Sequence, residues 1–127
     1  MSKLLFIAGG GALGSVLRYL VQGWVQTLSG GMFPLGTFVV NIFGCLVIGF
    51  LNKAFTETLL IRPEYRLALT VGVLGGFTTF SAFGWETFSL ANEGQALRAS
   101  VNALLSVGTG LAAVWLGYRL AEHWLGA

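Results

Sequence analysis

The sequence predicts an all-α integral membrane protein with four transmembrane helices, of which the third is broken. Of its 127 residues, 55% are hydrophobic and only 9% are charged, against about 25% charged in an ordinary soluble domain. A soluble domain of this size has too little interior to bury so much apolar surface. A bilayer is itself apolar, and four segments approach the ~20 residues that cross it.

The four predicted spans cover about residues 4–21, 35–51, 67–90 and 97–118 within one domain, 1–127. Helices are expected because backbone polar groups in lipid must be bonded within the chain. The N-terminal apolar run continues to Val21 without a convincing cleavage site, so it is interpreted as the first span and not as a signal peptide. The connections are too short to form a further domain.

Charge and cysteine content exclude several classes of protein. The net charge is only +2, and the basic residues are scattered, so nucleic acid is not expected as a partner. Cys45 is the only cysteine, which excludes a disulfide framework. An N-inside orientation would place most of the lysines and arginines on the cytoplasmic side.

A glycine motif near the N-terminus has the form of a dinucleotide-binding fingerprint. Gly9, Gly11 and Gly14 form G-x-G-x-x-G after a short apolar run. That fold also needs an acidic residue about 20 positions further on, but the first acidic residue here is Glu57, beyond the second span. The carboxylates show no close pairing, and nothing resembles a Ser-His-Asp set. The protein is therefore not expected to be an enzyme.

Other glycines indicate close helix packing. Gly10-x-x-x-Gly14 and Gly72-x-x-x-Gly76 are patterns in which small residues let two membrane helices approach each other. The pattern is compatible with packing inside one chain or with dimerisation.

The third span contains the most informative stretch, from Gly72 to Glu86. It holds two adjacent glycines, two threonines, a serine and a further glycine, a composition that a regular lipid-facing helix avoids. Helix interruptions at membrane depth persist where protein or water lines them, and in transporters they form ion sites. We therefore predict a broken helix at an ion site. The alternative is a glycine-rich packing helix.

Phenylalanines recur in this stretch at helical spacing. Phe77, Phe80 and Phe83 are predicted to lie broadly along one side of a helix. They form either a packing ridge or a set of ring edges, whose positive hydrogens attract anions without a full charge that would trap them. Nearby hydroxyl donors are Thr78, Thr79 and Ser81.

Three further polar residues are candidates for the site. Arg18 within a span either raises the local potential for an anion or extends to the interface. Asn41 either offers amide donors to an anion or links helices together. Glu86 is a proton-linked gate, a partner of Arg18 or an exposed charge at a helix end.

At these residues the chain resembles the Fluc (CrcB) family of fluoride channels. The matching motifs are Gly-x-x-x-Arg18 in the first span, Gly36-Thr37-Phe-Val-Val-Asn41 in the second, and Gly75-Gly-Phe-Thr-Thr-Phe-Ser-Ala-Phe83 with Glu86 in the third. The length and the four-span plan agree along the whole chain. The fourth span matches mainly in character, with Gly108-Thr109 where a Gly-Ser pair is usual.

The resemblance implies an antiparallel, dual-topology homodimer in a bacterial inner membrane, with two fluoride pathways and the broken helices crossing at its centre. Backbone carbonyls matching Gly75 and Thr78 from both subunits would hold a structural sodium ion. The implied function is passive export of cytoplasmic fluoride, because HF enters acidified cells and ionises inside. The residues that match or would extend the anion route are Phe80, Phe83, Asn41, Ser81, Thr79, Arg18 and Glu86.

Two positions depart from the family pattern. Ala82 stands where a threonine is typical, and Gly84 stands where a serine is typical. Each change removes a hydroxyl from the expected polar track. The charge bias toward one orientation also leaves open a heteromer with an oppositely oriented paralogue.

Two other functions are weighed against the channel. A small multidrug-type exporter is also a short four-span dimer, but proton-coupled export of that kind generally requires a carboxylate in the first span, which has none here. A non-transporting assembly subunit would leave the hydroxyl-rich third span without a purpose.

Overall fold

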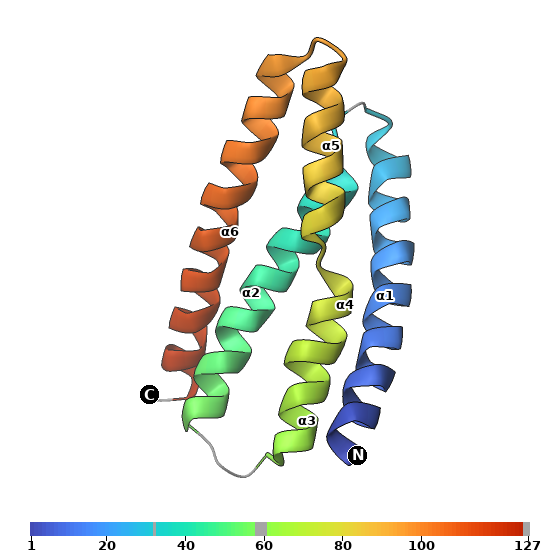
Figure 1. The fold of residues 1–127 in the computed structure, drawn as a ribbon. Coiled ribbons are helices and arrows are strands. Elements are labelled where there is room, and N and C mark those ends of the chain that lie inside the picture. Colours follow the sequence, from blue (N-terminus) through green and yellow to red (C-terminus); the bar gives the residue numbers. More distant parts are fainter. Residues whose placement is uncertain (32, 58–60, 126–127) are drawn as a thin grey trace.

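The computed structural model describes residues 1–31, 33–57 and 61–125, which are helical apart from short connections (Figure 1). In chain order the elements are α1 (Ser2–Ser29), α2 (Leu35–Glu57), α3 (Pro63–Leu67), the π-helical segment η1 (Ala68–Leu74), α4 (Gly75–Phe77), α5 (Phe80–Asn92) and α6 (Ala96–Leu125). Four helical stretches are long and apolar enough to cross a membrane, the third being Pro63–Asn92. The predicted four-helix plan is therefore confirmed.

Each predicted span lies inside a longer helical stretch, which in the third span is interrupted. Backbone hydrogen bonding continues through polar residues, so α1 extends past Val21 through Gln22 and Gln26 to Ser29. It ends at Gly30, which adopts the left-handed conformation (φ 58°, ψ 10°) and donates its N–H to the carbonyl of Gln26 at 3.1 Å. Glycine adopts this conformation without strain. Hydropathy alone thus underestimates the helix lengths.

The third span is divided into two halves that pack against different neighbours. The segments α3, η1 and α4 contact α1, whereas α5 contacts α6. The remaining long helix, α2, packs mainly against α6. In Figure 1 the two halves meet near mid-height, and both chain termini lie at the same end of the bundle. The interruption is therefore the place where this span changes its packing partner.

The predicted glycine pairs form a close contact between α1 and the first half of the third span. A methyl group added to Gly72 would lie 2.9 Å from the carbonyl oxygen of Ile7 and 3.0 Å from the Cα atom of Gly10. One added to Gly76 would lie 2.7 Å from the carbonyl oxygen of Gly11. The small-residue pattern therefore serves packing inside the chain.

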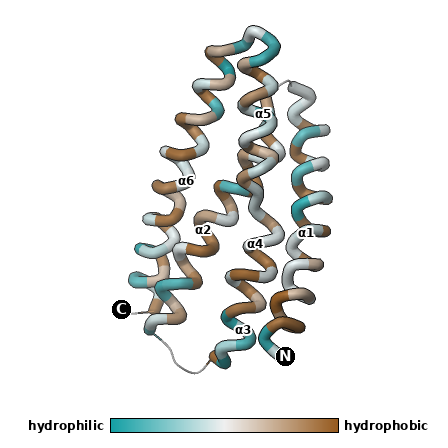
Figure 2. The backbone as a smooth tube through the Cα atoms, in the orientation of Figure 1, coloured by the Kyte–Doolittle hydropathy of each residue, from teal (hydrophilic) through white to brown (hydrophobic). Residues whose placement is uncertain are grey.

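The interior holds few large side chains, and the outer surface is apolar. Buried positions on α6 are mostly small, for example Ala99, Ala113, Gly117 and Ala121. Many leucines, valines and aromatic residues are exposed, as expected where lipid surrounds the bundle. Figure 2 shows hydrophobic residues along the helices, and hydrophilic residues in the upper half of α1 and near the ends of the bundle.

The glycine contact gives a stability prediction. A Gly14→Ala change would place a methyl group against the backbone of Val73 and Phe77, including the amide nitrogen of Phe77 at 3.0 Å. Backbone on both sides cannot move aside, so we expect a loss of about 1–3 kcal/mol, seen as a lower melting temperature in detergent. Gly9, with open space around it, provides the control: Gly9→Ala should not lower stability, since alanine favours helix. Equal losses in both variants would contradict the packing role.

Candidate ion pathway

The predicted break in the third span lies at Thr78 and Thr79. Both residues are extended, with φ −93° and ψ 158° at Thr78 and φ −151° and ψ 120° at Thr79. The hydroxyl oxygen of Thr79 accepts the backbone N–H of Ala82 at 3.2 Å and so caps the start of α5. Threonine suits this position because it favours extended backbone and caps helix N-termini. The adjacent glycines, Gly75 and Gly76, remain helical and do not form the break.

Asn41 of α2 completes the backbone hydrogen bonding of the break. Its side-chain oxygen accepts the N–H of Thr79 at 2.8 Å, and its Nδ2 donates to the carbonyl of the same residue at 2.9 Å. The amide therefore replaces the helical partners that Thr79 has lost. Of the two roles weighed for Asn41, linking helices is the one that these contacts bear out. An amide nitrogen carries two hydrogens, so a second donor remains for another ligand.

The carbonyl groups before the break are bonded selectively. Leu74 accepts the N–H and the hydroxyl of Thr78, at 3.0 and 2.9 Å, and Gly76 accepts Nε of Arg18 at 3.0 Å. Among the described residues, none of the hydrogen bonds around the break reaches the carbonyls of Gly75, Phe77 or Thr78. Carbonyls at a helix C-terminus carry partial negative charge and attract cations.

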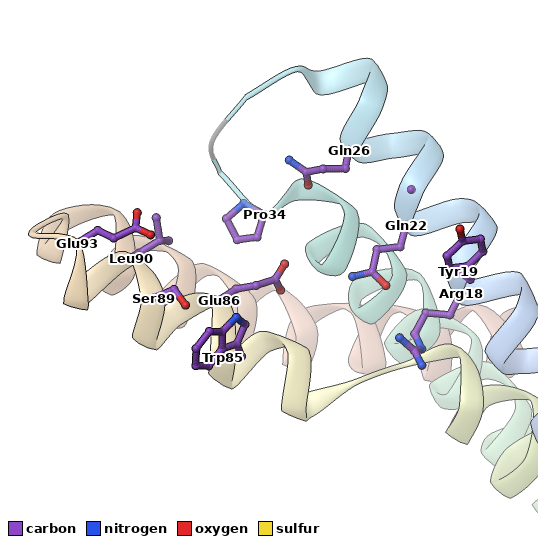
Figure 3. A pocket seen from close by; sticks show the side chains of 11 residues that line it. Arg18, Tyr19, Gln22, Gln26, Pro34, Trp85, Glu86, Ser89, Leu90 and Glu93 are labelled. Carbon is purple, nitrogen blue, oxygen red and sulfur yellow. The ribbon is translucent and has the colours of Figure 1, made fainter.

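Arg18 of α1 points at the break. Besides its bond to Gly76, the residue lines a cavity of about 560 Å³ between α1, α5 and the start of α2. Figure 3 shows its side chain directed from α1 toward the third span. An arginine has five N–H donors, so the guanidinium keeps donors that face this cavity. Arg18 therefore interacts with the third span through at least one of its donors.

Glu86 of α5 faces the same cavity and is held by a relay from α1. Gln22 donates to the hydroxyl of Thr37 at 2.7 Å, and Thr37 donates to Oε2 of Glu86 at 3.0 Å. The other carboxylate oxygen, Oε1, is buried without a protein hydrogen-bond partner among the described residues. The ion pairs found in this part of the chain do not join Glu86 to Arg18. Both side chains nevertheless face the same cavity (Figure 3).

The two predicted ring-edge residues, Phe80 and Phe83, lie close together at the start of α5. The rings of Phe80 and Phe83 have their centroids 5.6 Å apart and are tilted by 44°. They line a groove of about 380 Å³ bounded by α2, the third span and α6. Phe80 is 82% exposed. The groove lining also contains side chains with polar or sulfur atoms, namely those of Asn41, Cys45, Thr70, Thr78, Thr79 and Ser106.

The predicted ridge of three phenylalanines is wrong at Phe77. This ring is 7% exposed and packs edge-on against Phe43 of α2, with centroids 6.1 Å apart. The helical spacing that would align it with Phe80 fails because two extended residues separate them. Phe77 is therefore a packing residue and does not line the groove.

The hydroxyl groups near the break differ in how free they are. The hydroxyl of Thr78 donates its hydrogen to the carbonyl of Leu74. Thr79 and Ser81 have their hydroxyl oxygens 3.4 Å apart, and Ser81 is exposed. At Gly84, a family departure, the space around the backbone is open. Thr79 therefore lines the groove, and the exposed Ser81 lies next to it in the first turn of α5 without being part of the groove lining.

Sequence reasoning missed Gln22 and Ser106. Gln22 follows Arg18 by four residues and therefore shares its helix face, so the spacing contained a signal. The sequence contained no comparable signal for Ser106, because only the packing of α6 places this residue in the groove wall with Phe83.

Comparison with known proteins identifies the family. The sequence profile of a family described as "CrcB-like protein, Camphor Resistance (CrcB)" matches residues 5–118. Relatives named "Fluoride-specific ion channel FluC" include one from Geotalea uraniireducens, 48% identical over 96% of this chain and 98% of its own. Others come from Geobacter sulfurreducens (47%, covering 97% and 99%) and Solibacter usitatus (49%, covering 95% and 99%). A profile match over most of the chain, with nearly full-length relatives at this identity, shows that this multi-pass membrane protein belongs to the CrcB (FluC) family of fluoride channels, not to a family of enzymes.

Proposed function

We propose that this protein is a selective channel through which fluoride leaves the cytoplasm of a bacterial cell passively. The interrupted third span carries the proposal, because it opens onto a groove whose lining has ring edges, hydroxyls and an amide but no charged side chain among the described residues. Such a lining compensates an anion for lost hydration without trapping it. The names of the relatives support fluoride as the ion.

In this proposal the groove and the cavity beside the break serve the same route. Arg18 and Glu86 face the cavity, where the arginine attracts anions. Phe80 and Phe83 offer their ring edges in the groove, and Asn41 offers its second N–H. Hydroxyls for the route are those of Thr79 and Ser81.

We propose further that the functional unit is an antiparallel, dual-topology homodimer. A phenylalanine that is 82% exposed beside a groove open to the outside lacks the second wall that a conduction route needs. A second copy of the chain, crossing at the break, would supply that wall and produce two routes.

A structural sodium ion at the centre of this dimer fits the carbonyl arrangement. Leu74, Gly76 and Thr79 have hydrogen-bonded carbonyls, whereas those of Gly75, Phe77 and Thr78 accept none of the hydrogen bonds found around the break among the described residues. The resemblance to the family selects Gly75 and Thr78 from these three. Oxygen atoms without a donor are the ligands that a hard cation prefers. In the proposed dimer the two carbonyls from each subunit would hold the ion and join the broken helices.

The first experiment is fluoride efflux from liposomes that contain the purified protein, measured with a fluoride electrode. We expect rapid fluoride release and, from chloride-loaded liposomes, none. A channel requires no proton gradient, so release should not depend on one. Absence of fluoride release from correctly incorporated protein, or a drug-induced proton flux, would contradict the proposal.

The ring-edge contribution is tested by Phe80→Ile and Phe83→Ile. Isoleucine keeps the groove apolar but removes the positive ring edge, so we expect fluoride flux to fall roughly tenfold or more with the dimer still assembled. Phe6→Ile is the control, because the ring of Phe6 pairs edge-on with Tyr65 of α3 and lines neither the groove nor the cavity. Unchanged flux in both groove variants would refute the ring-edge role.

Sodium is tested by exchanging it for N-methylglucamine during purification. If sodium joins the two subunits, its removal should lower the melting temperature of the detergent-solubilised dimer, since an ion that binds only the folded state stabilises it. Returning sodium should restore the transition. A melting temperature that is the same with either cation would argue against the site.

A further inference from the structure

A buried asparagine joins α6 to α5 near the groove. Asn102 is 2% exposed, and its Nδ2 donates to the hydroxyl oxygen of Thr87 at 2.8 Å. The hydroxyl of Thr87 in turn donates to the backbone carbonyl of Phe83 at 2.8 Å. A buried amide is costly unless it is bonded, and an apolar residue would suit a membrane helix better. The bond to Thr87 therefore offsets the cost of burying the amide of Asn102. Packing of α6 alone would not require a polar residue at this position.

The direction of the relay is fixed by chemistry. A threonine hydroxyl has one hydrogen, and Thr87 places it on the carbonyl of Phe83. The same oxygen must then accept from Asn102, which is a donor through Nδ2. Hydrogen bonds linked in this way polarise and strengthen one another. The relay thus runs from α6 through α5 to the backbone of a residue whose ring lines the groove.

The relay anchors α5 to α6, whereas two other polar contacts anchor it to α2: Asn41 with Thr79, and Thr37 with Glu86. Asn41 of α2 fixes Thr79, immediately before the first residue of the helix, and Asn102 of α6 fixes Thr87 about two turns later. Phe80 and Phe83 lie between these points. Both other contacts come from α2, so the bond from α6 is the one that fixes the rotation of α5 about its own axis from a second direction. Ring direction follows from it.

We propose that Asn102 and Thr87 are positioning residues, which hold α5 at the rotation that directs the ring of Phe83 into the groove. The proposal rests on the fluoride conduction proposed above. The two helices also contact each other and bury apolar residues, Leu90 on α5 and Ala99 on α6, so a polar pair is not needed for burial alone. The polar relay adds direction to that contact.

The test compares Asn102→Leu, Thr87→Val and Thr87→Ser in the full-length protein. Valine keeps the shape of threonine and removes the relay, and serine keeps the hydroxyl. Leucine also removes the relay but is larger than the buried asparagine, so Thr87→Val is the decisive variant. We expect fluoride flux per incorporated channel to fall about tenfold in the first two variants, the order expected for a lost orienting hydrogen bond, and to stay near wild type in Thr87→Ser. The double variant Asn102→Leu/Thr87→Val should be no worse than either single one, since both act through one relay. Thr56→Val, which removes a hydroxyl bonded only to the backbone of its own helix, should leave flux unchanged.

A second readout does not depend on transport. In protein carrying 4-fluorophenylalanine in place of Phe83, the ¹⁹F resonance should shift or broaden in Thr87→Val but not in Thr87→Ser. A changed resonance in an assembled dimer supports the positioning role even if wild type shows no flux, an outcome that would overturn only the proposed function. Conducting wild type with equal flux and an unchanged resonance in Thr87→Val would overturn the positioning role. A lower melting temperature with normal flux and resonance would do the same, because it would assign the relay to stability alone.

Discussion

The structure depends on one constraint, which is that backbone polar groups cannot be left without partners in an apolar medium. Breaking the third span at Thr78 and Thr79 frees N–H and C=O groups that a continuous helix would satisfy. Side chains from two other helices replace some of the lost partners: Asn41 from α2 bonds both polar groups of Thr79, and Arg18 from α1 bonds the carbonyl of Gly76. The break therefore requires polar residues inside neighbouring spans, where they would otherwise be costly.

These substitute bonds are short, so the helices that supply them must lie close to the break. Glycines provide that proximity. A methyl group on Gly44 of α2 would meet the side chain of Thr78, and one on Gly14 of α1 would meet the backbone of Val73 and Phe77. Larger residues at either position would move Asn41 or Arg18 away from their acceptors. The glycine contacts and the polar contacts are consequently parts of one arrangement, and neither accounts for the break alone.

The sequence was sufficient for features that depend on local composition and insufficient for those that depend on packing. Apolar runs predicted the four spans, and a cluster of glycine and hydroxyl residues predicted the break. The π-helical segment Ala68–Leu74 and the full helix lengths had no comparable signal. Phe77 was misplaced because its spacing was interpreted on a continuous helix. The partner of Arg18 could not be predicted from the sequence, because it is a backbone carbonyl 58 residues away. Every residue has such a carbonyl, so the type of residue at that position gives no indication of the bond.

Charged residues are distributed unevenly along the proposed route. The strength of the attraction between a full charge and an anion explains why. A full positive charge 4 Å from an anion contributes about 4 kcal/mol at an effective dielectric constant of 20, which slows release about a thousandfold. Arg18 and Glu86 face the larger cavity, and the smaller groove is lined by no charged residue among those described. Ring edges and hydroxyls contribute on the order of 1 kcal/mol each. Several such contacts together can offset the cost of dehydration. An ion that moves along the route can break one contact and form the next at a small cost each time.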